Sequence, residues 1–143
     1  MTSLDRFINT LLKLAKPGSF IRRYRLGIGL LYRKYQHIRH RIQSKHLPTT
    51  GFRKDLFKNG QEGEMYRHLY FHLACYQLGP LGHLFSWFIG LTDIKQAASG
   101  RKESETEVRD NLAGRQCGRI LKAYLKGKID EETARAQLRS ELA

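Results

Sequence analysis

Apolar residues return at helical spacing from the first residues of the chain. The first stripe predicts a helix over residues 4–15, because its apolar side chains recur every three or four positions. This stripe consists of Leu4, Phe7, Ile8, Leu11, Leu12 and Ala15. Ser3 is the expected N-cap, and Pro17 with Gly18 ends the helix.

A second and longer pattern predicts a helix over residues 19–45. Its apolar positions alternate by threes and fours, which is typical of a helix that lays one seam on a partner. The seam consists of Ile21, Tyr24, Ile28, Leu31, Tyr35, Ile38 and Ile42. We expect it to be buried against an aromatic helix further along the chain, since an exposed seam would leave a large apolar patch. Gly27 and Gly29 weaken this helix and indicate either close packing or a kink.

Four further helices are expected, with no competing alternation typical of strands. They cover residues 64–78, 83–97, 104–125 and 131–142. Gly79 and Pro80 separate the first two, and Asp130 is the expected N-cap of the last. The fold class is therefore all-α, an antiparallel helical bundle of five to six helices with a basic N-terminal helical pair.

Turn-forming residues divide the chain at one place. We predict a basic amphipathic helical region over 1–46, a loop over 47–63 and a helical bundle domain over 64–143. At 143 residues with 41% apolar and 27% charged residues, the parts are expected to form one compact unit.

Mean hydropathy is -0.53, and no apolar run approaches the ~18 residues of a spanning helix, so no transmembrane segment is expected. Cys75 and Cys117 are interpreted as reduced and buried, although sequence alone does not decide whether they form a bridge.

Positive charge is concentrated in the first part of the chain. Through residue 58 there are 14 Lys and Arg but only two acids, a net of +12 out of the total of +13. A polyanion is the natural partner of such a segment: nucleic acid, an anionic lipid surface or an acidic partner protein. The expected polyanion-binding residues are Arg22, Arg23, Arg25, Arg33, Lys34, Arg39, Arg41 and Lys45.

His68 and His72 lie four positions apart, so both can face the same way from one helix, as metal-binding histidines do. The glutamate that a zinc protease places beside the first histidine is missing, and His83 is the only third imidazole nearby. The ligand count favours packed or hydrogen-bonded histidines, and we expect no metal and no cofactor.

A polar string at 109–115 is unusual for a helix interior. Asn111 and Arg115 lie one turn apart, and Gly114 would allow a close helix crossing there. A buried polar network and an active site are both consistent with this pattern. We favour the network, because no nucleophile with an adjacent base is evident. The expected cluster consists of Arg67, His68, Asp93, Asp110, Asn111 and Arg115.

These residues carry a resemblance to a known family. The order of His68, the turn at 79–82, the Leu-Thr-Asp of 91–93 and the Asn-Leu-Ala-Gly-Arg of 111–115 resembles serum amyloid A over about residues 64–118. It is also similar to uncharacterised domains of bacterial polymorphic toxins, in which an Arg-His pair opens the pattern. The resemblance implies an antiparallel helical bundle with His68, Asp93, Asn111 and Arg115 on the retained positions. The toxin pattern has a His-Glu pair after the Asp, where this chain has Ile94, Lys95 and Gln96.

Three functions follow as hypotheses. The first is an interaction module that binds an anionic membrane surface, which the resemblance extends to a secreted bacterial effector or toxin with an immunity or other partner protein. The second is a nucleic-acid-binding protein that uses the Arg-rich helix. The third is a hydrolase-type toxin with His68, His72 and Asp110 as candidate catalytic residues, although we lean against an enzyme. A solvated basic face without a ligand is the alternative to all three.

The N-terminus lacks the pattern of a secretory signal, because Asp5, Arg6 and Lys13 interrupt its apolar stretch. We expect a protein made in the cytoplasm, with export by a specialised route if it is an effector. A mitochondrial presequence fits the basic, amphipathic start less well.

Overall fold

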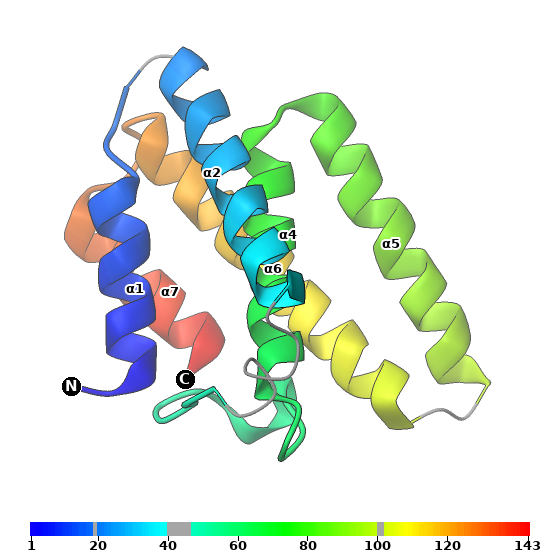
Figure 1. Cartoon of the computed structure of the whole chain (residues 1–143). Coiled ribbons are helices and arrows are strands. Elements are labelled where there is room, and N and C mark those ends of the chain that lie inside the picture. Colours follow the sequence, from blue (N-terminus) through cyan, green and yellow to red (C-terminus); the bar gives the residue numbers. More distant parts are fainter. Residues whose placement is uncertain (19, 40–46, 100–101) are drawn as a thin grey trace.

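The chain is an all-α bundle, as the sequence predicts, and no strand occurs in the part that the structure describes. This computed structural model describes residues 1–18, 20–39, 47–99 and 102–143. The helices are α1 (Ser3–Leu14), α2 (Phe20–Arg39), α4 (Glu62–Gln77), α5 (Pro80–Ala98), α6 (Lys102–Leu125) and α7 (Glu131–Leu142), with the short 3₁₀ helix η1 (Lys54–Leu56). Figure 1 shows α2 lying across α4 and α6, α5 standing at one side, and α1 and α7 at the other.

Local capping explains two of the helix starts. Thr2, and not Ser3, caps α1, because its side chain accepts a hydrogen bond from the backbone of Asp5 while the Asp5 carboxylate accepts one from the backbone of Thr2. Asp130 caps α7 as the sequence predicts, by accepting from the backbone of Thr133 at 2.7 Å.

The turn between α4 and α5 is shorter than the sequence predicts. Gly79 has a φ of +88°, a conformation that L side chains rarely adopt, and Pro80 already begins α5. Gly82 lies inside the first turn of α5, where it lets that helix approach the backbone of Cys75. The tight turn reverses the chain, so α4 and α5 run side by side in opposite directions (Figure 1).

The core lies between α1, α4, α6 and α7. Leu4, Ile8 and Leu11 of the first predicted stripe are all buried in it. Leu69 and Leu73 of α4 belong to the same buried cluster as Cys117 and Leu121 of α6. The rings of Phe7, Phe52, Tyr66 and Tyr70 form edge-to-face contacts in it. Cys75 and Cys117 are buried and are not bridged, as expected.

The predicted seam of α2 is wrong. Ile21 is 64% exposed, Ile28 is 55% exposed, and Tyr24 and Tyr32 are exposed beside them, while Leu31 is half-buried. The seam side chains Tyr35, Ile38 and Ile42 lie outside the described part of the molecule. α2 does pack on the aromatic helix α4, but through another face.

Gly27 is the physical reason for this difference. A Cβ at Gly27 would lie 2.8 Å from Leu78 Cδ2 and 3.2 Å from the Ala74 carbonyl oxygen, so this glycine marks a close approach of the α2 backbone to α4. Leu30, one turn later on the same face, is fully buried. α2 therefore packs on α4 through the face that carries Gly27 and Leu30, and most of the described stripe of large apolar residues stays exposed. Gly29 has no neighbour within 4 Å and plays no such role.

Candidate functional site

The polar side chains of α4 and α6 meet in register along a close helix contact. A Cβ at Gly114 would lie 3.0 Å from the Cβ of His72, and one at Gly118 would lie 2.9 Å from the Cβ of Tyr76. Gly114 thus lies at a close crossing, as the sequence predicts. The contacts advance together along both helices, so α4 and α6 run in the same direction and present one polar face to each other.

His72 joins three helices. It is fully buried on α4, its Nδ1 lies 2.6 Å from the Ser86 hydroxyl of α5, and its Nε2 lies 2.7 Å from Asn111 Oδ1 of α6. Because the amide oxygen of Asn111 only accepts, Nε2–H donates to it and Nδ1 accepts the Ser86 hydroxyl proton. Both ring nitrogens are therefore engaged within the protein, which suits a structural link better than a ligand or a catalytic base.

His68, one turn before His72, lies in a different environment. Its Nδ1 is 2.8 Å from Oδ2 of Asp110, and Asp110 is almost completely buried on α6. The ring itself is only partly buried. A carboxylate that accepts from Nδ1–H directs the lone pair of Nε2 away from the pair. Of the three candidate catalytic residues, the structure therefore joins His68 to Asp110 and places His72 in the separate link to Asn111.

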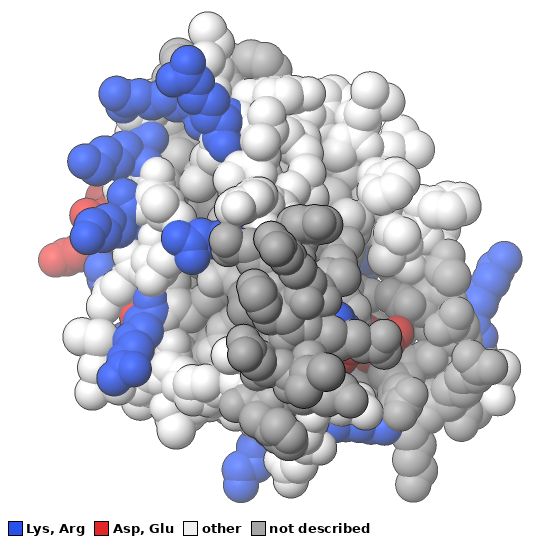
Figure 2. All heavy atoms as spheres, in the orientation of Figure 1, with Lys and Arg blue, Asp and Glu red and all other residues white. Residues whose placement is uncertain are grey.

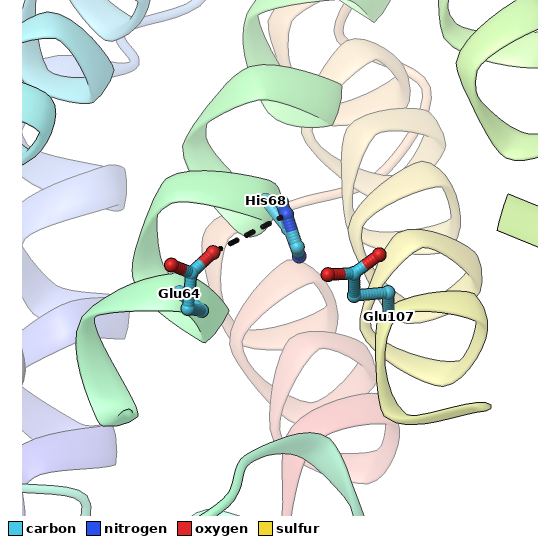
Figure 3. Close-up of side chains that lie close together, drawn as sticks. All are labelled: Glu64, His68 and Glu107. Atoms are coloured by element: carbon cyan, nitrogen blue, oxygen red, sulfur yellow. Dashed lines mark ion pairs between the residues drawn. The ribbon is translucent and has the colours of Figure 1, made fainter. Parts of the chain in front are cut away.

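Two carboxylates that the sequence analysis missed lie beside His68. Glu64 precedes it by one turn on α4, with Oε2 at 3.9 Å from His68 Nε2, and Glu107 approaches from α6. Figure 3 shows both carboxylates turned toward the imidazole from two helices. The signal was present as Glu64 four residues before His68 and Glu107 three residues before Asp110, spacings that bring side chains together on a helix.

Two other members of the predicted cluster, Arg67 and Arg115, have partners of their own in the structure. Arg67 forms an ion pair with Glu64. Arg115 is buried on α6, and its guanidinium lies 4.9 Å from the ring centre of Trp87 on α5. The side chain of Asp93 lies outside the described residues. The described contacts of these side chains run along α4 and α6 and reach α5 at Ser86 and Trp87.

A cationic groove lies between the end of α1 and the first half of α2. Its volume is about 430 Å³, and its cations stand around a floor formed by leucines. The lining cations are Lys13, Lys16, Arg22, Arg25 and Arg33. No acid lines this groove among the described residues. Figure 2 shows Lys and Arg gathered over this side of the molecule.

The predicted polyanion-binding residues fall into two groups. Arg22 and Arg25 are exposed, while Arg23 and Arg33 are half-buried. The side chains of the remaining four lie outside the described part: Lys34, Arg39, Arg41 and Lys45. Arg22, Arg25 and Arg33 line the cationic groove with Lys13 and Lys16 of the α1 end, whereas Arg23 is not part of its lining.

α5 exposes a broad apolar face. Leu84 is 70% exposed and Phe88 is 67% exposed, and their neighbours on the same arc are also exposed. These neighbours are Leu81, Phe85, Trp87 and Leu91. The opposite side of the helix packs on the bundle, where Ser86 is buried and Gly82 and Ile89 are partly buried. Two rings of the apolar face also contact the bundle, Phe85 against Phe71 of α4 and Trp87 against the Arg115 guanidinium of α6. The upper half of α5 therefore forms an uncharged surface, which is white in Figure 2.

A second groove of about 530 Å³ follows this apolar face and ends at two basic side chains. Leu84, Trp87 and Phe88 line it, and Lys122 closes it with His83, whose Nε2 is 3.2 Å from Lys122 Nζ. Burial, and then the Lys122 ammonium, lower the pKa of His83. Burial, and then the Lys126 ammonium, lower the pKa of Lys122. An anion at this end of the groove would offset the repulsion from these ammonium groups, which is the second cause of each shift.

Within the described residues, every helix is either too short or too polar to cross a membrane. Comparison with known proteins gives no match to a family model, to a curated protein or to a solved structure.

Proposed function

We propose that this protein binds anionic membrane surfaces through the face formed by α2 and α5. One observation carries the proposal: a broad apolar surface on α5 is exposed in a chain of net charge +13, together with a cationic groove beside α2. Soluble monomers rarely expose large contiguous apolar patches unless these bind a partner or a membrane. Apolar side chains next to Lys and Arg are typical of helices that lie in the interface of an anionic bilayer.

The arrangement on α2 fits this geometry. Ile21, Tyr24, Ile28 and Tyr32 follow one exposed stripe of the helix. Arg22 and Arg25 lie between that stripe and the buried Leu30, so the cationic groove borders the apolar stripe directly. Apolar residues could then enter the acyl boundary while the guanidinium groups contact phosphates, since Arg binds phosphate in a fixed fork geometry.

The groove on α5 suits an amphiphile for the same reason. Its walls are apolar, and Lys122 at its end provides a positive charge for an anionic headgroup. The resemblance to serum amyloid A, a lipid-binding family, agrees with this proposal, and membership of that family stays a prediction. A role as a secreted effector is a further hypothesis, which an immunity-like gene beside the coding gene would support.

Vesicle flotation tests the electrostatic contribution of the cationic groove to membrane binding. We expect the protein to float with phosphatidylglycerol-containing vesicles at ~50 mM salt, to float far less with phosphatidylcholine alone, and to dissociate as salt rises. Each cation near an anionic surface contributes about 1 kcal/mol, so Arg22→Gln with Arg25→Gln should weaken binding roughly 25-fold. The control is Lys54→Gln with Arg109→Gln, which removes two exposed cations outside the groove. Equal losses in both double variants would contradict a role of the groove.

Apolar substitutions distinguish membrane binding from nucleic-acid binding. Leu84→Ser with Phe88→Ser removes two exposed side chains from α5, and each contributes about 1.5–3 kcal/mol if it enters the bilayer. The control is Leu112→Ser on the exposed side of α6. We expect the α5 variant to lose vesicle binding. If vesicle binding is absent in the wild type and a DNA duplex is bound equally by both variants, the nucleic-acid hypothesis replaces the membrane proposal.

A further inference from the structure

Three potential metal ligands converge between α4 and α6, away from the proposed membrane face. They are Glu64 and His68 of α4 and Glu107 of α6. One ligand atom from each lies within 4.8 Å of the other two, a spacing that a single bound ion can bridge (Figure 3). All three are partly buried, so an ion could enter from solvent without unfolding the helices.

The His68 imidazole is held in the form that a metal requires. Asp110 accepts from Nδ1–H at 2.8 Å, which leaves Nε2 with its lone pair on the side of Glu64, while Glu107 completes the group from α6. A carboxylate behind a ligating histidine fixes the tautomer and the ring orientation and increases the basicity of the ligand. Since Asp110 is almost completely buried, it cannot readily turn away to solvent.

A small cleft adjoins these carboxylates. Its volume is about 20 Å³, and Glu64, Glu107 and Asp110 line it together with Thr106 and Lys58. This volume is sufficient for about one water-sized occupant. The cleft therefore leaves room for a small species beside the carboxylates of Glu64 and Glu107.

The surrounding charges still favour a cation. Arg67 pairs with one oxygen of Glu64, which orients that carboxylate and leaves Oε2 on the side of His68. Lys58 lines the cleft. Against these two cations stand three carboxylates, those of Glu64, Glu107 and Asp110, so the immediate surroundings remain net negative when all are ionised.

We propose that Glu64, His68 and Glu107 bind one divalent transition-metal ion, with Asp110 as the positioning residue for His68. One imidazole nitrogen with carboxylate oxygens suits Zn²⁺ or Mn²⁺, whereas Ca²⁺ and Mg²⁺ prefer oxygen ligands alone. Three protein ligands leave a coordination position open, as in sites that bind a water or a substrate group. The site differs from the pair of histidines that the sequence suggests, because His72 is engaged by Ser86 and Asn111.

Calorimetric titration of the tag-free protein with ZnCl₂ and MnCl₂ tests the site. The predicted result is one ion per chain for at least one of the two metals. Glu64→Gln and Glu107→Gln should each raise Kd at least ~10-fold, since each removes a charged ligand at nearly constant shape. The matched control is Glu105→Gln, an exposed carboxylate on the same helix outside the ligand group, which should bind like the wild type.

A second measurement separates this site from adventitious binding at His83 or elsewhere. Co²⁺ should give visible absorption bands in the wild type and in Glu105→Gln, and these bands should be lost in Glu107→Gln. The proposal is overturned if neither Zn²⁺ nor Mn²⁺ binds at ~1 mM, or if the Glu64 and Glu107 variants bind as tightly as Glu105→Gln. It does not depend on vesicle binding, so either proposal can fail alone.

Discussion

Asp110 and His68 are joined by a hydrogen bond of 2.8 Å between Oδ2 and Nδ1, which connects α6 to α4. One turn further along α4, His72 makes an equivalent connection to Asn111 through its other ring nitrogen, Nε2. The two histidines are neighbours in sequence and yet differ in their surroundings, because His72 is fully buried and His68 is partly exposed. One therefore holds helices together, and the other presents a nitrogen to two carboxylates.

Asn111→Ala should destabilise the fold. The substitution leaves the buried Nε2–H of His72 without its acceptor, which costs about 1–3 kcal/mol in the free energy of unfolding. Urea unfolding followed by circular dichroism measures this. Leu112→Ala, at the exposed neighbouring position, is the control and should change the free energy by less than about 0.5 kcal/mol. Equal effects of the two substitutions would show that the His72 link contributes nothing to stability.

Two helical glycines should respond to alanine in opposite directions. A Cβ at Gly82 would lie 2.1 Å from the backbone oxygen of Cys75, so Gly82→Ala must displace α5 from α4 and should cost about 1–3 kcal/mol or more. Gly29 has open space around it, so Gly29→Ala should gain up to about 1 kcal/mol from helix propensity. Thermal unfolding compares the two variants with the wild type. A stabilising Gly82→Ala would refute the close α4–α5 packing.

Asp5 should make stability depend on pH in the acid range. Hydrogen bonds from the side chain and backbone of Thr2, with the Arg139 guanidinium, lower the pKa of Asp5 from 3.8 to about 2. A lowered folded-state pKa stabilises the protein above the ordinary pKa, and this contribution disappears as pH falls from about 4 to about 2. We therefore expect the stability difference between wild type and Asp5→Asn to shrink over this range in urea unfolding. A constant difference from pH 5 to pH 2 would contradict this.

Local patterns predicted the fold class and most helix positions, because apolar periodicity is combined with breaking residues after α1 and with the N-cap Asp130 before α7. The face that α2 buries was not predictable in this way. The heptad stripe contains the most apolar residues, so a local pattern selects it as the buried face. The contact with α4 is made instead at Gly27, where the two backbones approach closely. Long-range backbone distances of this kind are absent from local sequence patterns.

The candidate residues show the same limit. Sequence spacing correctly draws attention to His68, Asn111 and Gly114, since each lies on the α4–α6 contact. It does not reveal that Glu107 of α6 reaches His68 of α4, because the register of two helices that are separated by a third is set by packing. The apolar α5 face was missed for a related reason. A helix that is apolar on all sides suggests burial, and only the assembled bundle shows which side remains uncovered.

Trp87 offers the most direct measurement of the proposed membrane face. It is the only tryptophan in the chain, it is 49% exposed, and it lines the apolar groove of α5. We predict that vesicles containing phosphatidylglycerol shift its fluorescence emission to shorter wavelength and that brominated acyl chains quench it. Phosphatidylcholine vesicles and the Arg22→Gln, Arg25→Gln variant should produce much smaller changes at the same salt concentration. If the protein floats with anionic vesicles while Trp87 emission and quenching stay unchanged, α5 does not face the bilayer and the account is wrong.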